Sequence, residues 1–480
     1  KIGGAQSSAL FLDKAKALNY QYDKTNASSL AIDYAKQLAK KDEAAASKFA
    51  TTLFNNAAKA KGSAVQVGAL EVLTDIDPQK QKKELLKLAS SDDKVLRNVA
   101  LGLLADNASA SDLLKLASSM RKLDGDAQES VLNFLATKDA AGSVGLIEKG
   151  FPKLKDEEAK IAAYHALSVL SKGSNVPFLI KQIPSASKNE LKTIKTMLLS
   201  AKDAGTIDLV NAALPSADEK TQLLLLEVLA QRMNLNSASV VLPLTKSSDK
   251  AVRAAAFKAL PNVVNNSDFE SVIALVNDAE GADLVSAQQA AILALQASAD
   301  KDAKIQRLAA NISRSSAPSA AKYFPIFAGV GGADALKAVE NYVNNPGLKA
   351  ASIDALSKWN HEEALPALIK LARTEKDPAL FNTIFTGLIK QLNASKQSAE
   401  QKTLTLRDAF ALAQTAKQKQ SALSSMQATN TYQAMMFASR YMNDPELKGT
   451  ASNVAMNIAM DNKEYVGSDV RGILQQAADN

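Results

Sequence analysis

A ladder of helix-start residues at nearly constant spacing constrains the fold of this chain more than any other feature. An Asp or Ser stands every 31 or 32 residues, and a Leu follows each of them eleven positions later. The six pairs are Asp93/Leu104, Asp124/Leu135, Asp156/Leu167, Ser187/Leu198, Asp218/Leu229 and Asp249/Leu260. A fixed period of this length is typical of stacked helical repeats, in which no single repeat can bury its own apolar face.

The segment from Asp249 to Leu260 shows why each period is expected to be helical. The Asp249 carboxylate can accept hydrogen bonds from the free N–H groups of a helix start. An apolar stripe at helical spacing follows, formed by Val252, Ala255, Ala256, Ala259 and Leu260. Prolines such as Pro243 and Pro366 fall in the expected first helix of each pair, where a first turn tolerates them. The pattern predicts an all-α fold, an α-solenoid of about thirteen stacked helix pairs.

The regularity of the ladder divides the chain into four ranges. We expect an N-terminal helical cap with divergent repeats at 1–61, regular repeats at 62–262 and looser repeats at 263–467. In the looser repeats the expected starts of second helices are Asn345, Asp377 and Asp444. A terminal helix at 468–480, capped by Ser468 and Asp469, is a candidate docking end for a further domain or partner.

The absence of cysteine excludes several kinds of chemistry. Thiol catalysis, disulfides and cysteine metal sites all require a residue that the chain lacks. A long cytosolic helical protein usually carries some buried cysteines, so we expect an extracytoplasmic protein, periplasmic or secreted, from a bacterium. The chain begins at Lys1 rather than Met, which indicates a mature or otherwise shortened form. No apolar run approaches the ~20 residues of a membrane span.

The net charge of +7 comes from a surface rich in lysine. Of the 57 basic residues, 47 are Lys and ten are Arg. A groove for nucleic acid would rely more on Arg, whose planar fork binds phosphates and guanines through paired hydrogen bonds. We therefore expect a solvated surface and no nucleic-acid partner.

The residues Asp249-Lys-Ala-Val-Arg-Ala-Ala-Ala-Phe-Lys-Ala-Leu260 resemble the second helix of a HEAT repeat of the short, bilin-lyase-like type. The family pattern is Asp-Pro-x-Val-Arg-x-x-Ala-x-x-Ala-Leu, and Asp377-Pro378 and Asp444-Pro445 match its opening. The resemblance covers about 63–455 and implies a HEAT-like solenoid. HEAT repeats serve many unrelated partners, so it implies no particular function.

In the HEAT family the Arg of this pattern tends to join adjacent repeats. Arg97 and Arg253 keep it, whereas other repeats carry Lys or Gln, for example Lys160, Lys349 and Gln128. The position is apolar at Leu191 and Phe381. A continuous Asp–Arg ladder along the stack is therefore not expected.

A looser resemblance rests on overall character. The cysteine-free repeats, rich in Ala, Lys, Asn and Gln, look like the N-terminal arm of secreted bacterial proteins that carry a 3-keto-disaccharide hydrolase or glycoside-hydrolase-like domain. That domain, with its strand patterning, is not in this sequence. The resemblance implies an arm that positions a carbohydrate-active domain, linked to carbohydrate metabolism.

The residues with catalytic chemistry have structural explanations. His165 is expected on a helix surface, and His361 in a first turn, beside a capping pair of Asn360 and Glu363. The glycines of Gly329–Gly332 precede a helix, as in phosphate loops, but without a preceding strand they predict an inter-helix turn. Runs such as Asp156-Glu157-Glu158 lie at helix starts, where carboxylates complement the helix dipole. We predict no catalytic, cofactor-binding or metal-binding residue and no cofactor.

Two clusters of large side chains suggest either core or contact surface. The first holds Tyr323, Phe324, Phe327, Tyr342 and Trp359, for which core filling is the preferred interpretation. The second holds Tyr432, Met435, Met436, Phe437, Tyr441 and Met442, and is interpreted as a packed end cap.

These observations predict a non-enzymatic binding scaffold with the shape of an armadillo-like superhelix. They do not identify its cellular function. A protein or polymer partner would lie on the concave surface. The alternative is the arm that positions a glycoside-hydrolase-like domain, and binding residues are not identified.

Overall fold

The computed structural model describes residues 4–22, 24–202, 205–360 and 362–480. These residues form thirty α-helices and short 3₁₀ turns, and the described ranges contain no strand. The predicted all-α fold of stacked, HEAT-like helix pairs is therefore confirmed. The chain divides into two compact units, Lys1–Val228 and Leu229–Asn480.

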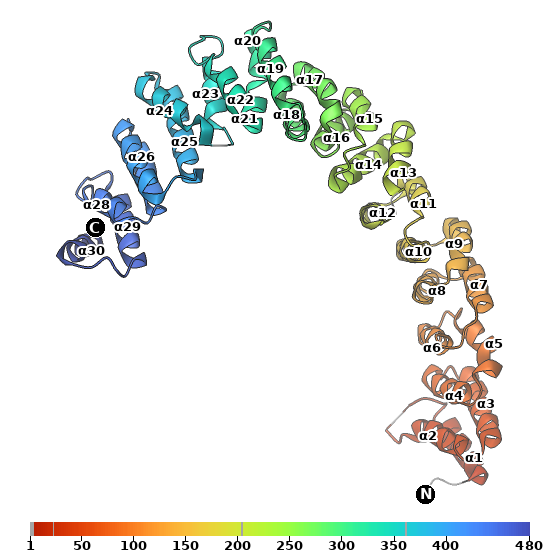
Figure 1. Ribbon diagram of the computed structural model, residues 1–480. Helices are drawn as coiled ribbons and strands as arrows, with labels where there is room; N and C mark the ends of the chain where they lie inside the picture. Colours follow the sequence, from red (N-terminus) through yellow and green to blue (C-terminus); the bar gives the residue numbers. More distant parts are fainter. Residues whose placement is uncertain (1–3, 23, 203–204, 361) are drawn as a thin grey trace. The chain divides into compact units, whose positions relative to one another are not determined.

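The first unit stacks helix pairs in two rows (Figure 1). The first helices are α1 (Ser8–Ala17), α3 (Glu43–Lys59), α5 (Pro78–Leu88), α7 (Ala110–Ser119), α9 (Val144–Gly150), α11 (Val176–Gln182) and α13 (Thr206–Ala213). The second helices are α2 (Ala27–Ala39), α4 (Ser63–Ile76), α6 (Lys94–Leu104), α8 (Gly125–Thr137), α10 (Glu157–Leu170), α12 (Lys188–Ser200) and α14 (Glu219–Arg232), within which the unit ends. The second-helix row lies on the inner side of this unit's bend.

The second unit repeats the arrangement. Its first helices are α15 (Ala238–Val241), α17 (Phe269–Asp278), α19 (Lys301–Ile312), α20 (Ala317–Ala321), α22 (Ala333–Glu340), α24 (Leu365–Thr374), α26 (Ala399–Leu412) and α28 (Tyr432–Ser439). Its second helices are α16 (Lys250–Ala259), α18 (Gly281–Gln296), α21 (Phe324–Val330), α23 (Lys349–Ser357), α25 (Pro378–Ala394), α27 (Ala416–Gln427) and α29 (Lys448–Asp461). The terminal helix α30 (Ser468–Asp479) packs on α29.

The ladder residues begin the second helices, but their side chains do not all act alike. Asp93 accepts from the N–H groups of Val95 and Leu96, and Asp249 accepts from Val252 N at 2.8 Å. Asp124 and Asp156 occupy the same position without a capping hydrogen bond from the helix. Asp124 is instead paired with Lys155, at 2.7 Å.

Three of the expected helix starts are corrected. Asn345 and Asp444 each stabilise a turn, and the helices α23 and α29 begin four residues later, at Lys349 and Lys448. The terminal helix is preceded by Gly467, whose φ of 124° few other residues adopt, so Ser468 is the first helical residue rather than the cap.

The cap at Asp249 gives a stability prediction. Asp249→Ala should lower the free energy of unfolding by about 1 kcal/mol, because Val252 N loses its acceptor at the helix start. Asp124→Ala is the matched control and should have a smaller effect, because its exposed ion pair with Lys155 contributes little. Urea melts of both variants provide the measurement, and equal losses would contradict this assignment of caps.

Candidate functional site

Adjacent repeats of the first unit are joined by polar contacts at the position four residues after each helix start. Arg97 is 1% exposed; its Nη1 donates to Ser91 O at 2.9 Å and its Nε donates to Ser130 Oγ at 3.2 Å. At the equivalent position Gln128 donates to Lys153 O at 3.2 Å. Because Leu191 is apolar at this position, the ladder is interrupted, as its sequence predicts.

One repeat carries a buried carboxylate at a position that is apolar in the three repeats before it. Glu190 is 4% exposed, whereas Leu96 and Ala127 stand at the same place in α6 and α8. The Tyr164 hydroxyl donates to Glu190 Oε2 at 2.8 Å, and Lys160 Nζ lies 3.4 Å from Glu190 Oε1. Burial, and then the hydrogen bond to Glu190, raise the pKa of Tyr164, so its hydroxyl remains a donor. This group ties α10 to α12.

The groups described above face neighbouring repeats. The opposite side of the second helices faces solvent, and we call the row of residues along it the inner stripe. It consists of positions nine and thirteen residues after each helix start, which share one face because they are four residues apart. The members are Gly102, Asn133, His165, Thr196 and Glu227, with Asp106, Thr137, Val169 and Ser200, and all are exposed. The stripe is continuous because each second helix from α6 to α12 contacts the next, and the ion pair between Lys195 and Glu227 joins α12 to α14.

The inner stripe includes one of the two histidines. His165 is exposed on α10, as predicted for a helix-surface residue. His361 lies outside the described residues. Within the described ranges no group of three or more His, Cys, Asp or Glu side chains is placed to hold a metal ion. None of the helices in those ranges is both long and apolar enough to cross a bilayer.

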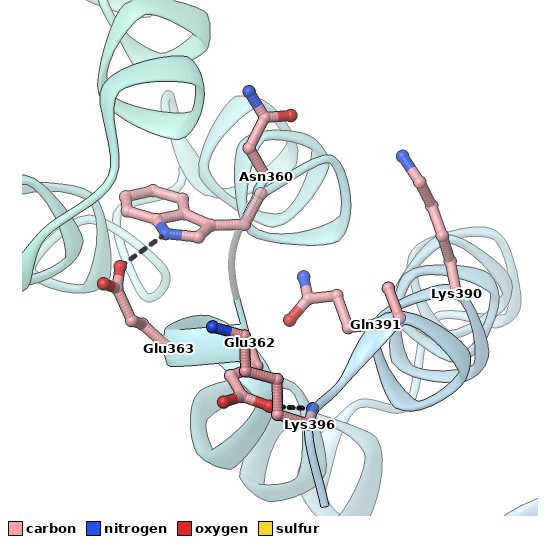
Figure 2. A pocket seen from close by; sticks show the side chains of 8 residues that line it. Asn360, Glu362, Glu363, Lys390, Gln391 and Lys396 are labelled. Carbon is pink, nitrogen blue, oxygen red and sulfur yellow. Dashed lines mark hydrogen bonds between the residues drawn. The ribbon is translucent and has the colours of Figure 1, made fainter. Parts of the chain in front are cut away.

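The second unit contains a cleft of about 410 Å³ beside Trp359 (Figure 2). Its walls come from the segment after α23 and from the end of α25, and include Glu362, Glu363, Lys390 and Gln391. Trp359 is only 2% exposed, and its Nε1 donates to Glu363 Oε2 at 3.2 Å. The indole therefore forms a packed wall of the cleft.

Both carboxylates of this cleft accept hydrogen bonds from the main chain. Glu363 Oε2 accepts from Gly332 N at 2.9 Å, and Glu362 Oε2 accepts from Lys396 N at 2.8 Å. Gly332 has a φ of 95°, in the left-handed region where glycine is favoured. Glu363 thus holds Gly332 in the inter-helix turn between α21 and α22. The turn was predicted over Gly329–Gly332, but α21 extends through Val330, so only Gly331 and Gly332 form it.

The predicted capping pair of Asn360 and Glu363 is corrected by these contacts. The Asn360 N–H donates to Ala328 O at 3.2 Å, and its Nδ2 donates to Gly329 O at 3.3 Å. Both side chains therefore bind the preceding repeat, Asn360 at the end of α21 and Glu363 in the turn that follows it. The sequence could not reveal this, because the partners lie about 31 residues away.

Gln391 supplies an acceptor that the described residues leave unsatisfied. It is 3% exposed, and its Nε2 donates to Leu356 O at 2.7 Å. That carbonyl can only accept, so the amide nitrogen must face it, and Oε1 is left without a partner among the described residues. This oxygen is itself buried, so the polar groups that the cleft offers to a bound molecule are the exposed Lys390 and Lys396.

The two clusters of large side chains are mostly core. Tyr323, Phe324 and Phe327 are at most 3% exposed, which confirms core filling. Met435 and Met442 are fully buried, and Asn480 Nδ2 donates to Met442 O at 2.9 Å. In α30 Ile473 is buried and Leu474 is partly exposed.

A buried carboxylate in α7 gives a pH-dependent prediction. The Ser109 hydroxyl bond lowers the pKa of Asp112 to about 2, with help from the Ser109 N–H and Lys115 and against the effect of burial. A lowered folded-state pKa stabilises the fold above the unfolded-state pKa of about 4 and stops doing so as pH falls through about 2. Asp112→Asn should therefore cost roughly 2 kcal/mol at neutral pH and progressively less below pH 4. Urea melts across this range test it, and a pH-independent difference would contradict it.

No protein-family model and no curated protein matches this chain. Solved structures that it resembles include Kap121p bound to Pho4p, at 15% identity and a TM-score of 0.45, over 95% of this chain and 54% of that chain. Kap121p bound to Ste12p is similar at 15% identity and a TM-score of 0.47, over 95% and 53%. Importin beta is similar at 12% identity and a TM-score of 0.30, over 98% and 82%. The chain spans about half the length of the Kap121p chains. With TM-scores below 0.5, these likenesses do not say what this chain binds.

Proposed function

We propose that the chain is a non-enzymatic, HEAT-like scaffold that binds a protein or polymer partner along the inner stripe. The observation that carries the proposal is the continuity of this stripe over successive second helices. Positions such as Asn133, His165 and Thr196 are exposed at one place in each repeat, because the opposite side of each second helix packs and the period brings these positions into line. An extended partner can follow such a row, gaining a contact from every repeat.

The charged groups support binding over catalysis. Glu190, Glu362 and Glu363 are held by hydrogen bonds that join neighbouring repeats. A general acid or base needs access to a substrate and a pKa suited to proton transfer. These three carboxylates instead link neighbouring repeats, which is a structural role.

A partner-binding assay with matched surface variants tests the proposal. The full chain is used as bait, and the co-purified partner is identified and its affinity measured. Asn133→Arg combined with Thr196→Arg should weaken binding at least tenfold, because two bulky cations enter the inner stripe. Ser271→Arg with Ala274→Arg, at exposed positions on the first helix α17, is the control and should leave the affinity unchanged. Equal affinities of the two double variants would contradict the proposal, as would turnover of a glycoside, ester or phosphate abolished by one substitution.

The extracytoplasmic location is also a proposal, supported by the absence of cysteine from all 480 residues. Cell fractionation with an antibody to the chain tests it, and recovery in the cytosol would contradict it.

A further inference from the structure

The charges of the first unit are segregated between its two rows of helices. The first-helix segments at 78–88, 110–122, 144–153 and 176–185 carry ten basic residues and three acidic ones. The second helices α6, α8, α10 and α12 carry six basic and five acidic residues. The excess positive charge of this region therefore lies on the first helices, away from the inner stripe.

The basic residues of the first helices face solvent in consecutive repeats. Lys83 on α5, Lys115 on α7, Lys149 on α9 and Lys181 on α11 are all exposed, and we call these four the outer lysine row. Lys115 lies 3.2 Å from Asp112. The ion pairs among the described residues do not involve Lys83, Lys149 or Lys181. Three of the four ammonium groups are therefore available to an external anion.

The spacing expected for the outer lysine row, with one lysine on each successive first helix, suits an extended chain. Packed helices lie about 8–10 Å apart, and an extended polypeptide advances about 3.3–3.6 Å per residue. Every third residue of an extended acidic segment would then meet the next lysine. In Figure 1 the helices α5, α7, α9 and α11 follow one another in a single row, so such a segment would cross them in order.

We propose that the outer lysine row is a docking surface for an acidic polypeptide segment of a partner protein. Carboxylates need only positive charge within reach, and flexible lysine side chains supply it. Nucleic acid is less well matched, because Arg121 is the only arginine in these first-helix segments and the aromatic residues there, Phe151 and Phe178, are packed against each other rather than displayed as a stacking platform. An anionic membrane is less well matched too, because membrane-surface helices present several large apolar side chains beside their cations, whereas Leu114 is the one large apolar side chain exposed in these segments.

This surface is separate from the inner stripe, so its test is independent of the proposed function. The probe is a fluorescein-labelled polyglutamate peptide, titrated with the full chain and followed by fluorescence anisotropy. The row variant is Lys83→Glu, Lys149→Glu and Lys181→Glu combined. The control variant is Lys188→Glu, Lys192→Glu and Lys258→Glu, at exposed lysines of second helices. Both change the net charge by the same amount, and circular dichroism confirms that both fold.

The native chain should bind the peptide at low salt, and binding should weaken as salt screens the charges. The row variant should bind at least about tenfold more weakly, and the control variant within about twofold of the native chain. If both variants lost affinity equally, the loss would be explained by net charge alone, and the proposal would be overturned. Tighter row-dependent binding of a single-stranded oligonucleotide of equal charge, or of phosphatidylserine vesicles, would overturn it in favour of nucleic acid or membrane.

Discussion

Replacing Gly387 by alanine is expected to destabilise the second unit by about 2–3 kcal/mol, because an added methyl group has no room there. Gly387 lies in α25, where the helix packs on α23. A Cβ at this position would lie 2.5 Å from the Cα of Ser357 and 2.9 Å from its carbonyl oxygen. These are mostly backbone atoms, so no side-chain rotation can relieve the clash, and the two helices must separate.

Gly449→Ala in α29 is the matched control, with an expected effect of opposite sign. Gly449 is exposed, and nothing lies within 4 Å of the Cβ it would gain. Alanine favours helix over glycine by up to about 1 kcal/mol, so this variant should be neutral or more stable. Thermal and urea melts of the two variants give the comparison. A Gly387→Ala protein as stable as the native chain would show that α23 and α25 do not approach so closely.

Removing the Tyr164 hydroxyl should cost roughly 2–3 kcal/mol, because Glu190 then loses a hydrogen bond in a buried site. Both residues are at most 4% exposed, so water cannot readily replace the lost donor. Tyr164→Phe retains the ring, which packs against Phe151 with centroids 5.1 Å apart. The loss therefore reports on the hydroxyl rather than on the aromatic core.

A double-mutant cycle with Glu190→Leu isolates this interaction. Leucine stands at the same repeat position in α6, as Leu96, so the substitution suits the site. In the Glu190→Leu background, Tyr164→Phe should cost much less, because the hydroxyl no longer has a carboxylate to bind. Urea melts of the four proteins give the coupling energy. Strictly additive losses would mean that the Tyr164–Glu190 hydrogen bond contributes nothing to stability.

The repeat pattern was enough to predict the helical architecture. Each repeat between Asp93 and Asp249 shows its helix through local information, because its helix start and its apolar stripe lie within about a dozen neighbouring residues. The same holds for the glycine turn before α22, of which Gly331 and Gly332 are the residues outside a helix, and for His165, whose place in the period put it on a helix surface. Helix starts were wrong where the local signal was ambiguous. At Asn345 and Asp444 the same residue types stabilise a turn before the helix instead of the helix itself.

The tertiary structure decided which side chains meet across repeats. The residues around Glu363 predict a capping role for it. In the structure it binds Gly332, 31 positions earlier, because stacking brings the turn of one repeat beside the start of the next repeat. The unsatisfied Gln391 Oε1 likewise depends on Leu356 of the preceding repeat. The segregation of lysines onto the outer row also depends on the fold, because it is the stacking that places first and second helices in separate rows. Sequence determines the period because helix formation is local, whereas contacts between repeats depend on how the helices stack.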